Sequence, residues 1–215
     1  MPANKTMRIE MVADVVCPYC HIGLKRLLGA IAAASGASAA AVEVVYTPFI
    51  LRRHLPKEGV DKRTAFKQQY GNDAHGERIL ANIKATAAAD GLRFDLTGQR
   101  AGNSEDAHRL LLWSGGNLSL FEAMVKSYNE ESPSGWLGDH GVLLRAVESA
   151  GLDVAAAKAV LADDSAYANE LEAGLERSTM MGVSGVPAFF VDGQPLGAGA
   201  LDEEDLKEII ESTCK

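Results

Sequence analysis

The sequence has few cysteines, no excess of basic residues and no long apolar run. Its 215 residues include 3 cysteines, too few for a disulfide framework. The formal net charge of −8 argues against a nucleic-acid-binding surface or a basic membrane-binding stripe. No segment suits a membrane span, and the start, MPANKTMRIEMVADVV, lacks a secretory signal. We therefore expect a cytoplasmic protein that binds neither nucleic acid nor membrane.

The pattern of apolar residues predicts an α/β protein with strands near both ends of the chain. Residues 7–13 alternate in polarity as a strand does, and an amphipathic helix is predicted from Pro18. A second strand is expected over 42–47, followed by an entirely helical block from about 60 to 180. The segment AFFVDGQPLGAG, residues 188–199, predicts a tight hairpin with a proline at an edge or a bulge.

Two cysteines in the segment CPYC lie where the first predicted strand gives way to the helix. Pro18 suits the first helical position, which leaves Cys17 at or next to the N-cap. Backbone N–H groups and the helix dipole at this end stabilise a thiolate and lower its pKa. Such a thiolate attacks disulfides, and Cys20, one turn further along, can resolve the mixed disulfide. The pattern predicts a redox pair.

A metal site and a structural disulfide are the other roles open to this pair. A structural zinc site needs about four ligands. The close additional candidate, His21, directly follows Cys20 and points to another side of the helix, and Cys214 stands alone. A bridge across so short a loop removes little entropy from the unfolded chain. We therefore expect no metal, and thiol–disulfide exchange needs no cofactor.

Val186-Pro187 directly precedes the predicted strand of the hairpin. A proline at this place is explained by a cis peptide bond, which turns the preceding backbone outwards. The N–H and C=O of Val186 are then available to an extended substrate beside Cys17. An ordinary strand-starting proline is the alternative, but the CPYC pair favours the cis form.

Four segments, DVVCPYCHIG, NSEDAHRLL, GDHGVLLRAVESAGLD and GVSGVPAFFVDG, resemble those of the DsbA-like thioredoxin-fold oxidoreductases, in the right order. The similarity covers nearly the whole chain and is strongest to the FrnE-like branch of unexported bacterial proteins. It implies a thioredoxin fold, residues 1–55 and 180–215. It also implies a large all-helical domain, residues 56–179, inserted after the second strand.

The resemblance implies a thiol–disulfide oxidoreductase that acts on protein or peptide thiols and disulfides, as a monomer or homodimer. It implies Cys17 as nucleophile, Cys20 as resolving cysteine, and Pro187 as the cis-proline after Val186. Glutathione is a further candidate partner.

The dipeptide Pro18-Tyr19 departs from the DsbA pattern because it lacks the histidine of strongly oxidising members. Both residues are candidate substrate contacts, and this dipeptide tunes the redox potential, so the direction of exchange stays open. His21 and His108 are candidate groove residues, with ordinary packing as the alternative for each.

Two other functions remain as alternatives. The first is a glutathione-dependent isomerase or transferase of the 2-hydroxychromene-2-carboxylate isomerase type, a fold branch shared with kappa-class glutathione transferases. Those proteins typically have serine at the position of Cys17 and lack Cys20, so the presence of both cysteines argues against that chemistry. The second is a client-binding chaperone module built on the helical block.

Overall fold

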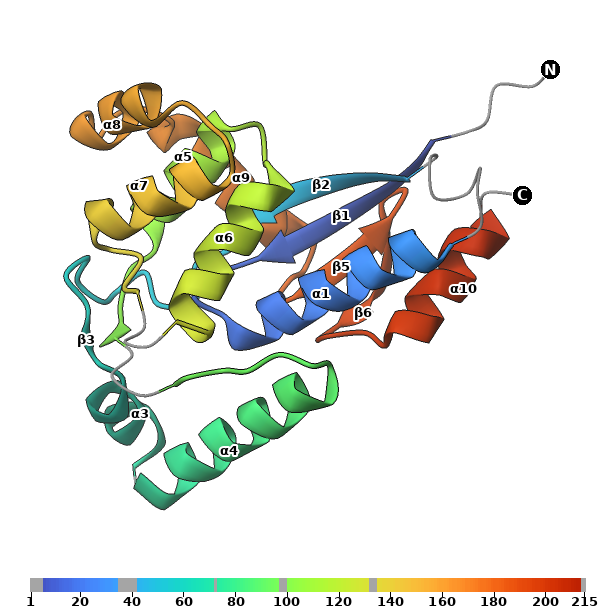
Figure 1. Cartoon of the computed structure of the whole chain (residues 1–215), viewed down its shortest axis with the longest axis horizontal. Coiled ribbons are helices and arrows are strands. Elements are labelled where there is room, and N and C mark those ends of the chain that lie inside the picture. The colour runs from blue at the N-terminus through green and yellow to red at the C-terminus, as the bar shows by residue number, and fades with distance from the viewer. Residues whose placement is uncertain (1–5, 35–41, 72, 97–99, 132–134, 214–215) are drawn as a thin grey trace.

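A four-stranded mixed sheet forms the centre of the protein (Figure 1). The computed structural model describes residues 6–34, 42–71, 73–96, 100–131 and 135–213. The strand order is β2-β1-β5-β6, with bounds β1 (Met7–Ala13), β2 (Val42–Pro48), β5 (Ala188–Val191) and β6 (Gln194–Ala198). β1 runs parallel to β2 and antiparallel to β5, and β6 runs antiparallel to β5. The sheet therefore joins the two ends of the chain, as predicted.

Helices cover both faces of this sheet. In the part of the chain that the structure describes, the helices of the whole protein, including those of the insertion, are α1 (Pro18–Ala33), α3 (Lys62–Tyr70), α4 (Asp73–Ala89), α5 (Glu105–Trp113), α6 (Leu118–Asn129), α7 (His140–Ser149), α8 (Val154–Ala162), α9 (Ala168–Met180) and α10 (Glu203–Thr213). α1 and α10 pack side by side on one face, and α9 lies against β2 on the other (Figure 1). The predicted α/β fold with a helical insertion after the second strand is confirmed. No helix of the described ranges could span a membrane.

The inserted block is not entirely helical, which corrects the prediction for residues 60–180. β3 (Val60–Asp61) and β4 (Arg100–Ala101) form an antiparallel pair within it. The Arg100 guanidinium donates hydrogen bonds to the carbonyls of Glu58 (2.9 Å) and Gly59 (2.7 Å), which holds the two segments together. Two-residue strands are too short to produce a visible period-two pattern, so the sequence did not show them.

β1 is buried along its length except at Arg8, and α9 packs against the neighbouring β2. Glu10, which alternation places on the polar side, is only 2% exposed. The Thr47 hydroxyl donates to one of its carboxylate oxygens (2.6 Å), and Arg177 of α9 donates to both (2.8 and 2.7 Å). The hydrogen bonds from Arg177 lower the pKa of Glu10 in spite of its burial. This ion pair fastens α9 to the sheet.

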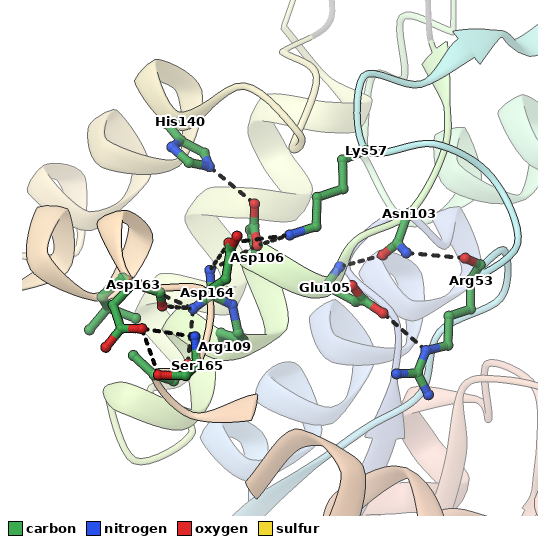
Figure 2. Close-up of polar contacts among 12 residues, drawn as sticks. Arg53, Lys57, Asn103, Glu105, Asp106, Arg109, His140, Asp163, Asp164 and Ser165 are labelled. Atoms are coloured by element: carbon green, nitrogen blue, oxygen red, sulfur yellow. Dashed lines mark hydrogen bonds and ion pairs between the residues drawn. The ribbon is translucent and has the colours of Figure 1, made fainter. Parts of the chain in front are cut away.

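A polar cluster around Asp106 holds the helices of the insertion together (Figure 2). The carboxylate accepts hydrogen bonds from Lys57 (2.9 Å), Arg109 (3.0 Å) and His140 (3.0 Å). Burial acts to raise the pKa of Asp106, but these three donors together lower it to about 2. Arg109 also reaches the end of α8, where its Nη1 donates to the carbonyls of Val160 (3.1 Å), Asp163 (2.7 Å) and Ala166 (2.9 Å).

Candidate active site

The CPYC segment lies where β1 leads into α1. Cys17 is the N-cap residue, with φ −91° and ψ 115°, and Pro18 is the first helical residue. The carbonyl of Cys17 accepts hydrogen bonds from the amides of Cys20 (3.0 Å) and His21 (3.3 Å), so the first turn of α1 closes on Cys17. The predicted helix start at Pro18, with Cys17 at the cap, is confirmed.

Cys17 and Cys20 are free thiols in different electrostatic surroundings. Cys17 is 5% exposed and Cys20 is fully buried. A hydrogen bond from the Cys20 thiol, together with those from the amides of Cys20 and Tyr19, lowers the pKa of Cys17 in spite of its burial. Burial raises the pKa of Cys20 well above its usual value, and the neighbouring Cys17 raises it further. Cys17 therefore ionises first.

The turn before β5 lies against the redox pair. The Val186–Pro187 peptide bond is cis, and the Cys17 thiol donates a hydrogen bond to the Val186 carbonyl (3.5 Å), across 169 positions in the sequence. Gly23 allows α1 to approach this turn, because a β-carbon there would lie 3.0 Å from Pro187 Cγ and 3.2 Å from Phe189 Cζ. The structure therefore brings Cys17, Val186 and Pro187 together.

The two histidines singled out from the sequence lie inside the protein. His21 is 2% exposed, stacks on Phe94 at a centroid distance of 5.1 Å, and places Nε2 3.2 Å from Glu130 Oε1. Burial lowers the pKa of His21 to about 4, so its ring is neutral at neutral pH. His108 is fully buried, and its Nε2 lies 3.2 Å from Asp14 Oδ1.

A cavity of 510 Å³ opens beside the redox pair, between the start of α1 and the helices α3 and α4. Val16 and Pro18 line one side, and the basic residues Arg52, His54 and Lys62 also line it. No acidic residue is among the lining residues that the structure describes. Lys62 is 5% exposed, and burial lowers its pKa to about 7. The cavity favours an anionic ligand close to Cys17.

The sequence analysis missed Lys62, Arg52 and Asp14. Arg52 belongs to the basic segment LRRH, and Asp14 stands three residues before Cys17. These local signals are common on protein surfaces. Only the fold shows that Arg52 and Lys62 line the cavity beside the redox pair and that Asp14 is buried next to it.

Comparison with known proteins identifies the family. A family model for the DSBA-like thioredoxin domain matches residues 8–211. The chain belongs to the DSBA-like thioredoxin domain family. The resemblance inferred from its motifs is thereby confirmed. No curated protein sequence matches this DsbA-like chain.

Solved structures show the same fold over almost the whole chain. A "probable DsbA oxidoreductase" from Streptomyces coelicolor is 30% identical, with a TM-score of 0.85 over 96% of this chain and 89% of the other. The cytosolic disulfide reductase DsbM from Pseudomonas aeruginosa, solved with GSH, is 15% identical, with a TM-score of 0.61 over 95% and 98%. A 2-hydroxychromene-2-carboxylate isomerase is 14% identical, with a TM-score of 0.64 over 95% and 93%. The last two likenesses show the fold alone.

Proposed function

We propose that this DsbA-like protein exchanges disulfides with protein or peptide thiols through Cys17 and Cys20. The main support is the site itself: Cys17, at the N-cap of α1, has a lowered pKa and contacts the Val186 carbonyl beside the cis-proline. A nucleophilic thiolate needs a lowered pKa, and a resolving thiol needs to stay protonated until the mixed disulfide has formed. Cys17 has the lowered pKa of a nucleophile, and Cys20 has the raised pKa of a resolving thiol.

In the reductive direction, the Cys17 thiolate attacks one sulfur of a substrate disulfide. A mixed disulfide forms, and the other substrate sulfur leaves as a thiolate. The Cys20 thiol then loses its proton and attacks the Cys17 sulfur, which releases the second substrate thiolate and forms the Cys17–Cys20 disulfide. The substrate gains two electrons and the pair loses two. The reverse sequence oxidises a substrate dithiol.

The residues around Cys17 form the proposed contact surface for an extended substrate. Val186 is half-buried beside the Cys17 thiol, and its backbone would pair with the substrate chain, with Pro187 holding the turn. Pro18 and Tyr19 are both partly exposed next to the cysteines and complete this surface.

An insulin assay tests this function. The wild-type protein is expected to accelerate the reduction of insulin disulfides by dithiothreitol, followed as turbidity. The double variant Cys17→Ser/Cys20→Ser is expected to show only the dithiothreitol background, because both exchanging sulfurs are gone. Cys214→Ser, which removes the remaining cysteine, is the matched control and should retain the wild-type rate. Full activity in the double variant would refute the proposal, and suppression of client aggregation by that variant would favour the chaperone alternative.

The basic cavity supports glutathione as a small thiol partner and the recycling reductant. Glutathione combines a thiol with two carboxylates, which suit a cavity lined by Arg52, His54 and Lys62 beside Cys17. DsbM, which shares the fold, is a cytosolic disulfide reductase that was solved with GSH. These observations also support the proposed cytoplasmic location.

Lys62→Met is expected to weaken the binding of S-methylglutathione about tenfold at pH 6, because one charge-assisted contact is lost. The pKa of Lys62 is lowered to about 7, so its charge is present below pH 7 and lost above it. Wild-type affinity should therefore fall as pH rises through 7, and the effect of Lys62→Met should shrink. Calorimetric titration at several pH values measures the affinity of the wild type and of Lys62→Met. Lys67→Met, on the same helix, is the control, and equal weakening by both variants would contradict the assignment.

An assay of chromene-carboxylate isomerisation distinguishes the isomerase alternative. The protein has thiols at both Cys17 and Cys20, whereas that reaction activates the thiol of glutathione itself. Ultraviolet detection of isomerisation with glutathione, retained in the double serine variant, would favour the isomerase over disulfide exchange.

A further inference from the structure

Asp14 is a buried acid that the exchange reaction does not use. It is fully buried in the loop between β1 and α1, three residues before Cys17. We propose that Asp14 is a positioning residue whose buried negative charge opposes ionisation of the Cys17–Cys20 dithiol and makes the pair a stronger reductant. This inference rests on the proposed redox function of the two cysteines.

Four donors converge on the Asp14 carboxylate. Its Oδ1 accepts hydrogen bonds from the Val16 amide (3.2 Å), the Ser104 hydroxyl (2.9 Å) and His108 Nε2 (3.2 Å). Its Oδ2 accepts one from the Leu51 amide (2.8 Å). The Val16 and Leu51 amides can only donate, so both side-chain oxygens of Asp14 are held as hydrogen-bond acceptors.

His108 connects the Asp14 carboxylate to Tyr46 on β2. His108 Nε2 faces the carboxylate, and its Nδ1 contacts the hydroxyl of Tyr46. Burial raises the pKa of Tyr46 well above its usual value, so this hydroxyl stays protonated. With a proton on Nε2, the imidazole donates to Asp14 and accepts from Tyr46, so all three groups make their hydrogen bonds while the negative charge stays on the Asp14 carboxylate.

A tight turn holds this charge beside the redox pair. The Cys17 amide donates to the Asp14 carbonyl (3.1 Å), while the Val16 amide donates to its carboxylate. The charge of Asp14 acts to raise the pKa of both cysteines, against the hydrogen bonds that lower the pKa of Cys17. The charged and titratable groups that the structure describes around the pair come from five segments. They are Asp14 in the loop, Tyr46 on β2, Lys62 on α3, His108 on α5 and Tyr128 on α6, and Arg52 lines the neighbouring cavity.

Destabilising the thiolate disfavours the reduced form of the pair, so the disulfide forms more readily and substrates are reduced more readily. Removal of the charge has the opposite effect. Asp14→Asn is therefore expected to lower the pKa of Cys17 by about one unit, as loss of a nearby buried charge does. At a pH above the Cys17 pKa of both the wild type and the variant, the redox equilibrium with glutathione should shift about tenfold toward the reduced pair. This shift corresponds to about 30 mV for a two-electron couple.

The test uses a Cys214→Ser background, in which Cys17 and Cys20 are the remaining cysteines. Thiolate absorbance is titrated against pH, and the redox equilibrium is measured in glutathione buffers. Glu10→Gln is the matched control, because it removes another buried carboxylate, one paired with Arg177 of α9. It should leave the pKa of Cys17 unchanged even if it destabilises the fold.

An unchanged or higher Cys17 pKa in Asp14→Asn would overturn the inference. If Asp14→Asn does not fold, Ser104→Ala decides, because it removes one donor and keeps the charge. The pKa of Cys17 should then rise by a few tenths of a unit, and an unchanged or lower pKa would overturn the inference. The titrations of Asp14→Asn and Ser104→Ala both measure ionisation of the thiols and do not depend on catalytic activity. A protein that ionises as expected but fails to reduce insulin would contradict the proposed function and leave the role of Asp14 intact.

Discussion

Cys17→Ser and Cys20→Ser are expected to fail at different steps of disulfide exchange. Cys17→Ser removes the sulfur with the lowered pKa, so a mixed disulfide forms only slowly and insulin reduction falls by about two orders of magnitude or more, to the background rate. Cys20→Ser keeps the attacking thiolate, and the serine hydroxyl can still donate a hydrogen bond to it. This variant should react once and then stop, because no second sulfur releases the substrate.

Mass spectrometry after treatment with glutathione disulfide, with every protein in a Cys214→Ser background, measures this difference. In Cys20→Ser, one glutathione adduct should accumulate on Cys17, whereas the wild-type protein should release its adduct as the Cys17–Cys20 disulfide forms. Cys17→Ser should gain an adduct only slowly, because burial raises the pKa of Cys20. A stable, rapidly formed adduct on Cys20 would reverse the two roles.

Arg109→Met is expected to lower the free energy of unfolding by about 3–5 kcal/mol, the usual cost of removing one partner from a buried ion pair. Arg109 is 3% exposed, and its loss leaves the Asp106 carboxylate with fewer donors. Three carbonyls near the end of α8 lose the same donor, and methionine replaces the volume without replacing the hydrogen bonds. For a chain of this size we expect the melting temperature to fall by about 10 °C.

Arg53→Met is the matched control for this prediction. Arg53 also makes an ion pair with Glu105 (Figure 2). It makes another with Glu172, but its side chain is 49% exposed. An exposed pair contributes about 0–1 kcal/mol, so this variant should unfold at nearly the wild-type urea concentration. Urea unfolding followed by circular dichroism compares the two. A loss below about 1 kcal/mol in Arg109→Met would show that the Asp106 cluster does not hold the insertion together.

The sequence by itself determined the local structure on both sides of the site. Pro18 begins α1 and leaves Cys17 at its N-cap, because a proline lacks the N–H that has no partner at this position. The predicted hairpin is also confirmed: Asp192 and Gly193 have φ values of 47° and 82°, and the ladder shifts register between Phe189 and Phe190, opposite the proline-containing strand. Such features depend on a few neighbouring residues, so the order of residues is enough to predict them.

Only the tertiary structure decided what surrounds the two sulfurs. Val186 meets Cys17 because β5 pairs with β1, and Lys62 approaches it because α3 packs over the cavity. Glu10 and Asp14 are acidic residues that a local pattern assigns to the surface, yet the fold buries both and supplies their donors from distant segments. Burial and charge depend on packing between elements, which a period of two or 3.6 residues along the chain does not encode.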